Sequence, residues 1–180
     1  TIGHEGAYSN DPQDRGGETY KGVSRKNHPG WMGWAFIDAA KVSKDFPNNL
    51  KDNANLQQKV KTFYEDQFWT KMRLSEISSQ EVANELFDTA VNQGISTAVK
   101  YFQSALNLLN QGQKDYPDMK EDGEMGSTTI ALFNAYMGTV NKYRSRTEQS
   151  NIKTLLKALN GLQFSRYTSI CTNNPSQEVF

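Results

Sequence analysis

The fold is decided by residues 78–109, which read SSQEVANELFDTAVNQGISTAVKYFQSALNLL. Ser78 and Glu81 have the spacing of a capping box, in which the two side chains satisfy backbone N–H groups at the start of a helix. Apolar residues then recur every three or four positions on both sides of Gly94, and glycine commonly ends a helix. The stretch therefore predicts two consecutive helices joined at Gly94.

The same apolar period continues in both directions from this stretch, so the fold class is expected to be mainly α. Residues 18–24 are expected to form a short strand or extended segment, and the polar residues 110–122 a surface loop that is mobile or touches a ligand. Further helices are expected over residues 34–44, residues 54–69, a segment that Ser127 or Thr128 caps, and residues 148–170.

Composition excludes several functional classes. The 180 residues suffice for one compact domain or two small lobes, and 20 basic residues balance 20 acidic ones. Without a net positive field, and without a run of 18 apolar residues, neither a nucleic-acid partner nor membrane insertion is expected. The single Cys171 excludes an internal disulfide and is interpreted as a buried apolar residue, and His4 and His28 lack metal-ligand spacing. No metal and no cofactor are expected.

Residues 4–22, HEGAYSNDPQDRGGETYKG, are rich in carboxylates and glycines, and packing alone does not explain them. Glu5 is expected near the C-terminus of a helix, where the negative end of the helix dipole and partial burial would raise its pKa. A glutamate with a raised pKa can act as a general acid at neutral pH. Asp14, on a loop bounded by glycines, is the candidate second carboxylate.

The order of these residues resembles glycoside hydrolase family 108, a family of bacterial and phage N-acetylmuramidases, some of them called secretion activator proteins. The residues that carry the resemblance are 5–8 (EGAY), 11–19 (DPQDRGGET) and 22–24 (GVS). Ala7 stands where the family pattern has a second glycine. Residues 88–94 (DTAVNQG) and 122–129 (DGEMGSTT) resemble the helical peptidoglycan-binding region that follows the catalytic part.

This resemblance implies a lysozyme-like helical fold, with a muramidase region over 1–77 and a peptidoglycan-binding-like region over 78–180. It implies cleavage of the β-1,4 bond between N-acetylmuramic acid and N-acetylglucosamine, and glycan strands of peptidoglycan as the partner. The enzyme is expected to be a monomer that acts at the cell wall, in the periplasm or outside the cell, although no signal peptide is visible. The implied catalytic residues are Glu5, Asp14 and Thr19. The candidate substrate-binding residues, chosen because their side chains can stack on sugars or hydrogen-bond to them, are Tyr8, Tyr20, Trp31, Asn92 and Gln93.

Several alternatives remain open at this point. Asp11 competes with Asp14 for the role of second carboxylate, since both also suit turns. Trp31 is either a core residue or a sugar platform, whereas Trp34 is expected in the core. The pair 92–93 either reaches a glycan or helps to end a helix. Ala7 supports an alternative function, a non-catalytic wall-binding or secretion-assisting protein on a lysozyme frame.

Overall fold

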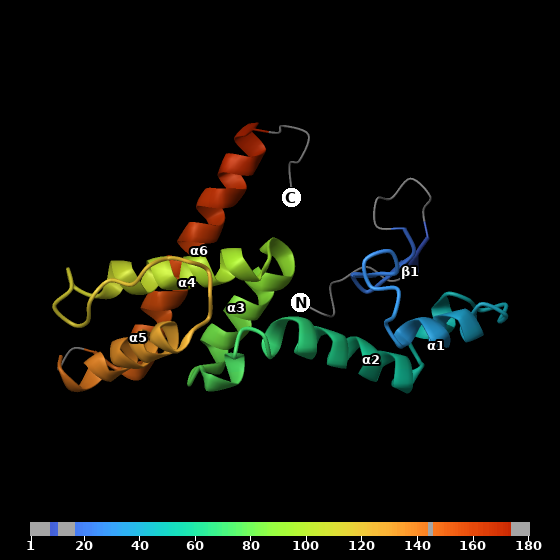
Figure 1. Ribbon diagram of the computed structural model, residues 1–180, viewed down its shortest axis with the longest axis horizontal. Helices are drawn as coiled ribbons and strands as arrows, with labels where there is room; N and C mark the ends of the chain where they lie inside the picture. The colour runs from blue at the N-terminus through green and yellow to red at the C-terminus, as the bar shows by residue number, and fades with distance from the viewer. Residues whose placement is uncertain (1–7, 11–16, 144–145, 174–180) are drawn as a thin grey trace. The chain divides into compact units, whose positions relative to one another are not determined.

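The computed structural model describes residues 8–10, 17–143 and 146–173 of the chain. Helices make up most of these residues, which confirms the prediction of a mainly helical protein (Figure 1). The chain divides into two compact units, Thr1–Gln67 and Phe68–Phe180. Within the described ranges, no helix has both the length and the apolar character needed to cross a membrane.

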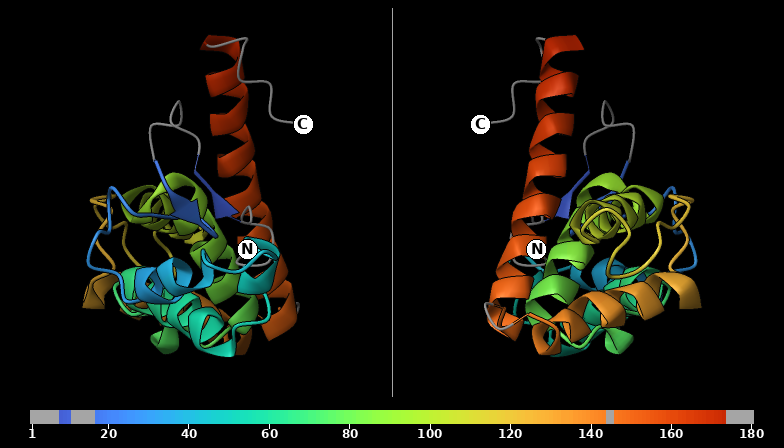
Figure 2. Two further views of the ribbon diagram at one scale, coloured as in Figure 1. Left: turned by 90° about the vertical axis from the view of Figure 1, so that its right-hand side faces the viewer. Right: turned by 90° about the vertical axis from the view of Figure 1, so that its left-hand side faces the viewer.

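The first unit contains a small antiparallel sheet, whose strands are drawn as short arrows in Figure 2. Strand β1 pairs with β2, and β2 pairs with β3. Tyr8 lies opposite Tyr20, and Ser9 lies opposite Thr19, so the segment between Ser9 and Thr19 starts and ends at neighbouring positions. The strands are β1 (Tyr8–Ser9), β2 (Thr19–Tyr20) and β3 (Val23–Ser24).

The turn between β2 and β3 was not predicted. Lys21 and Gly22 have φ angles of 44° and 79°. Positive φ at both central residues is what a type I′ hairpin turn requires. Residues 18–24 therefore form a hairpin rather than one extended segment, and lysine at the first central position gives no sequence signal for it.

Helices α1 (Gly33–Ala40) and α2 (Ala54–Tyr64) complete the first unit, with a 3₁₀ turn, η1 (Asn48–Leu50), between them. Helix α1 ends four residues before the expected position. A π-helical turn, η2 (Glu65–Trp69), follows α2, so the expected helix over 54–69 is α-helical only in part. The core of this unit is apolar and includes Trp34, as expected; its buried members are Tyr20, Val23, Trp34, Ile37, Leu50, Leu56, Val60 and Tyr64.

The second unit is a helical bundle in which α4 contacts α3, α5 and α6. The predicted helix over 95–109 is found with the same bounds. Figures 1 and 2 show the long helix α6 extending beyond the other helices of this unit. The elements are η3 (Leu74–Glu76), α3 (Gln80–Gln93), α4 (Ile95–Leu109), α5 (Ser127–Gly138), η4 (Thr139–Asn141) and α6 (Glu148–Asn173).

The helix caps differ from the predicted ones by one residue. The N-cap of α3 is Ser79, whose side chain accepts from the Val82 N–H at 3.3 Å, so Glu81 is one position too early for the predicted box. Helix α5 begins after Gly126 without a side-chain cap. Neighbouring serine and threonine residues leave the capping position open from sequence alone, because each hydroxyl can accept the bond.

The segment between α4 and α5 is held against the second unit by buried contacts. Tyr116 is 5% exposed, and its hydroxyl donates to the Leu106 carbonyl at 2.8 Å. The buried Gln103 side chain donates to Asp122 Oδ1 at 2.8 Å and accepts from the Gly123 N–H at 2.9 Å. The expected surface loop over 110–122 is thus fixed by α4 at its middle and at its end.

The two units divide after Gln67, whereas the functional regions expected from sequence divide after Ile77. The reason for the earlier division is packing, since Met72, Leu74 and Ile77 are buried in the core of the second unit. A role of the second unit in peptidoglycan binding stays a prediction.

Candidate functional site

The candidate site is built from the part of the glycine-rich motif that the structure describes. Glu5 and Asp14, the predicted acid and its partner, lie outside the described residues, as do Ala7 and Asp11. The described part begins at Tyr8 in β1 and resumes at Gly17, directly before β2. It shows how the segments that flank the two predicted carboxylates along the chain are held.

Glu18 is the centre of a polar cluster that joins the sheet to α1. Its Oε1 accepts from the Tyr8 hydroxyl at 2.9 Å and lies 2.8 Å from Lys41 Nζ. Its Oε2 lies 2.8 Å from Arg25 Nε, an ion pair whose angle falls short of a well-aligned hydrogen bond. The Glu18 side chain is only 11% exposed. Glu18 therefore braces the sheet against the end of α1 and is not a free surface charge.

A second carboxylate, Asp38, extends this cluster along α1. Arg25 donates to it from both terminal nitrogens, at 3.1 and 2.7 Å, and Lys41 Nζ donates at 2.9 Å. The Arg25 hydrogen bonds, followed by that of Lys41, lower the pKa of Asp38 to about 2. The Arg25 guanidinium also lies 4.5 Å from the Trp34 ring centre. The two cations are therefore oriented before any substrate binds.

Tyr8 contributes its hydroxyl to this cluster. Burial, followed by the hydrogen bond to Glu18 and the charge of that carboxylate, raises the pKa of Tyr8, so the phenol stays a donor at neutral pH. Its ring meets Phe46 edge-on, with centres 4.7 Å apart. The hydroxyl that the sequence assigns to sugar binding is thus engaged with Glu18 in this structure.

Thr19 and Tyr20 are neighbours in β2 with different surroundings. The Thr19 hydroxyl donates to the Gly17 carbonyl at 3.0 Å, which leaves its oxygen lone pairs available to accept a bond from water. Tyr20 is 2% exposed, and its hydroxyl accepts from Gln57 Nε2 at 2.9 Å. The structure gives the Tyr20 ring a packing position in the core of the first unit.

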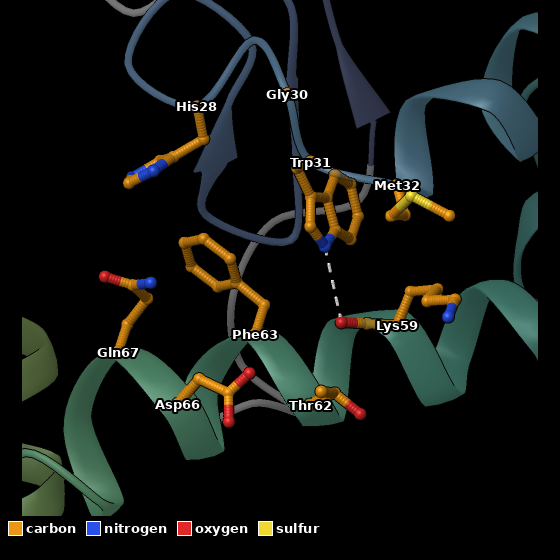
Figure 3. Close-up of a pocket in the computed structure, with 9 residues that line it drawn as sticks. All are labelled: His28, Gly30, Trp31, Met32, Lys59, Thr62, Phe63, Asp66 and Gln67. Atoms are coloured by element: carbon orange, nitrogen blue, oxygen red, sulfur yellow. Dashed lines mark hydrogen bonds between the residues drawn. The ribbon is translucent and has the colours of Figure 1, made fainter.

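Trp31 lines a pocket of about 420 Å³ between the loop before α1 and helix α2. Its indole Nε1 donates to the Lys59 carbonyl at 3.3 Å, as the dashed line in Figure 3 shows. The side chain is partly buried, so it is intermediate between the two predicted states, core residue and platform.

Three further residues of this pocket were not predicted as site residues. His28 and Trp31 reach from the loop toward the helix, and Phe63 points from the helix toward the loop (Figure 3). Asp66 lies on the π-helical turn η2 at the same pocket. The helical period of residues 54–69 favours a core role for Phe63, and nothing in that pattern indicates the π-helical turn.

Asn92 and Gln93 lie at the C-terminus of α3 in the second unit. Asn92 is exposed, and its Nδ2 donates to Asp88 Oδ2 at 3.2 Å. Gln93 Oε1 accepts from the Tyr101 hydroxyl at 3.2 Å, while its buried Nε2 has no hydrogen-bond partner within the described part of the chain. The backbone N–H of Gly94, and not a side chain of the pair, bonds back to Ala90 and ends the helix. A role of the pair in glycan binding stays a prediction.

Among the residues that the structure describes, no cluster of three or more His, Cys, Asp or Glu side chains could hold a metal ion.

Comparison with known proteins gives a family for the first half of the chain. No curated protein matches this chain. A solved structure, that of Brucella abortus SagA, is 20% identical over 98% of this chain and 83% of its own, with a TM-score of 0.49. The family model described as glycosyl hydrolase 108 matches residues 1–94, more than half of the chain, and this match includes the Glu5 motif, the sheet and both helices of the first unit. The chain therefore belongs to glycosyl hydrolase family 108, and its substrate is a glycan.

Proposed function

We propose that this glycoside hydrolase is a muramidase, which cleaves the β-1,4 bond between N-acetylmuramic acid and N-acetylglucosamine in peptidoglycan. Glu5 protonates the leaving oxygen. Asp14 either stabilises the positive charge that develops on the sugar or activates the attacking water. Thr19 orients that water through a lone pair of its hydroxyl oxygen.

The observation that carries the proposal is the fixed sheet beside the motif. Ser9 pairs with Thr19, so Asp14 belongs to a connection whose two ends are held together. Glu5 is three residues from Tyr8, and a chain spans at most about 3.6 Å per residue. Both carboxylates are therefore tethered within short reach of one sheet, which Glu18 braces through Tyr8, Arg25 and Lys41.

Bracing of this kind suits glycosidic bond cleavage. The acid and the second carboxylate must face each other across the bond, and small displacements cost much of the rate. An ion-pair cluster centred on the largely buried Glu18 holds the sheet that adjoins the motif along the chain, without contributing a side chain to the chemistry. This arrangement supports the assignment of Glu18 as a positioning residue and leaves Glu5 and Asp14 for catalysis.

The test measures release of reducing ends from purified peptidoglycan by the full chain. Glu5→Gln should abolish release while the circular dichroism spectrum stays unchanged, and Glu148→Gln, an exposed glutamate of the second unit, should be as active as the parent. Asp14→Asn should lose more activity than Asp11→Asn. Retained activity in Glu5→Gln would show that the acid is misassigned. Binding of peptidoglycan by the parent without new reducing ends would favour the non-catalytic alternative.

A further inference from the structure

The Trp31 pocket has the properties of a preformed ligand site. Its walls come from the loop at residues 28–32 and from helix α2 with its π-helical extension η2. A volume of about 420 Å³ lies in the range of about 300–1,000 Å³ that is typical of small-molecule sites. Every lining residue belongs to the first unit.

The Trp31 indole is held in one orientation although it is partly exposed. Its Nε1 donates to the Lys59 carbonyl, and its ring meets Trp34 edge-on, with centres 5.1 Å apart. Gly33 lies against the ring, because a Cβ at that position would overlap the six-membered ring of the indole. The loop and both helices of the first unit thus fix this side chain. A fixed ring loses little conformational entropy when a ligand binds to it.

Two further rings continue the apolar surface that Trp31 begins. The Phe63 ring lies edge-on to Trp31, with centres 6.1 Å apart, and edge-on to His28, with centres 4.8 Å apart. These three rings line the same pocket. They form a continuous aromatic wall rather than separate exposed residues.

Polar groups lie at the pocket beside this wall. Asp66 is exposed, and no hydrogen bond or ion pair of its carboxylate is found among the described residues. It lies on η2, and π-helical turns are rare features that frequently occur at functional sites. Lys59 also lines the pocket, so one negative and one positive group are present there.

The aromatic wall, together with Asp66 and Lys59, indicates the class of ligand. A cationic amine would be attracted to the rings and to Asp66, but Lys59 opposes a second cation. An anion would find one lysine and an opposing carboxylate. A neutral pyranose ring fits both features, since its C–H faces can lie on an aromatic ring while its hydroxyl groups donate to a carboxylate.

We propose that this pocket binds an N-acetylhexosamine unit of the glycan strand, with the Trp31 indole as the platform and Asp66 as a hydrogen-bond acceptor for sugar hydroxyl groups. The ligand class rests on the proposed function, whereas the pocket and its fixed tryptophan do not. Phe63 and His28 extend the apolar wall. Gly33 is a positioning residue that acts through Trp31.

Binding is tested in the full chain carrying Glu5→Gln, so that the probe is not cleaved. The probe is chitotetraose, a soluble β-1,4 oligomer of N-acetylglucosamine, and the measurement is isothermal titration calorimetry. Trp31→Ala should raise Kd about tenfold or more, since buried tryptophan anchors contribute strongly to binding. Gly33→Ala should also raise Kd by displacing the indole, and Trp31→Phe should have an intermediate effect.

Matched controls separate the pocket from general effects of substitution. Phe164→Ala removes an aromatic ring that is 69% exposed in the second unit, and it should leave Kd unchanged. Asp66→Asn should weaken binding, while Asp52→Asn, which removes an exposed carboxylate of the same unit, should not. Circular dichroism and thermal melting should show that each variant is folded.

Two results would overturn the proposal. One is a folded Trp31→Ala variant that binds chitotetraose as well as its parent. The other is a parent protein that does not bind chitotetraose but binds the diamine cadaverine through Trp31. Failure of the muramidase proposal is a separate observation, namely that the parent releases no new reducing ends from peptidoglycan, and it leaves the binding result intact.

Discussion

Lys41 Nζ lies 2.8 Å from Glu18 Oε1, so an ion pair joins helix α1 to the residue that precedes strand β2. On the other side of the same carboxylate, Arg25 Nε lies 2.8 Å from Oε2, directly after strand β3. One glutamate therefore connects three segments of the first unit. This contact holds the sheet that adjoins the predicted catalytic residues along the chain.

Glu18→Gln should destabilise the first unit by about 1–3 kcal/mol, because a neutral amide no longer compensates the charges of Arg25 and Lys41. The loss is smaller than for a fully buried pair, since both cations keep their contacts with Asp38 and are about one-third exposed. Urea unfolding followed by circular dichroism measures the change. The control is Glu76→Gln, which breaks an exposed ion pair with Arg73 and should leave the unfolding midpoint in place. Equal midpoints for the two variants would contradict the bracing role of Glu18.

Because of the Asp38 carboxylate, the stability of the fold should depend on pH in the acid range. Its pKa in the folded protein is lowered from an ordinary value of 3.8 to about 2 by Arg25 and Lys41. A lowered pKa stabilises the fold above the ordinary value, and this contribution is lost as the pH falls toward 2. The stability difference between the parent and Asp38→Asn should therefore be present at pH 6 and vanish at about pH 2. Asp52→Asn, which removes an exposed carboxylate of the same unit, should change stability little at pH 6.

The helices could be predicted from sequence because their information is local. The apolar period of 95–109 and the glycine at 94 reproduce the observed α4, and residues 80–93 form the observed α3. The hairpin turn was missed because Lys21 adopts a positive φ that its residue type does not suggest. The cap of α3 was misplaced because Ser78 and Ser79 offer the same hydroxyl chemistry.

The candidate site was harder to predict, because its contacts join distant parts of the chain. The order of Glu5, Asp14 and Thr19 is a sequence signal. The partners of Glu18 give no sequence signal, because residues 8, 25 and 41 are brought to it only by the fold. Trp31 was recognised as a candidate from its residue type. The wall that it shares with Phe63 appears only when the loop packs on α2.

The buried Gln103 side chain is expected to stabilise the segment before α5. Its side chain is 1% exposed and bonds to Asp122 Oδ1, the Glu124 carbonyl and the Gly123 N–H. Gln103→Met keeps the volume but leaves these partners without their bonds, which should cost about 1–3 kcal/mol in a urea unfolding experiment. The exposed substitution Gln149→Met should change stability little. A Gln103→Met variant as stable as the parent would show that water replaces the side chain.

Tyr8→Phe distinguishes two roles for the Tyr8 hydroxyl. The sequence assigns it to sugar binding, whereas the structure engages it with Glu18 at 2.9 Å, three residues from the proposed acid. Loss of a positioning bond should lower kcat, about tenfold if Glu5 shifts by a fraction of an ångström, and leave KM unchanged. Loss of a sugar contact should raise KM instead. The control is Tyr143→Phe, which removes a hydroxyl that donates to Asp115 at 2.8 Å in the second unit. Because both variants lose one tyrosine–carboxylate bond, a fall in kcat confined to Tyr8→Phe would assign the effect to the braced sheet.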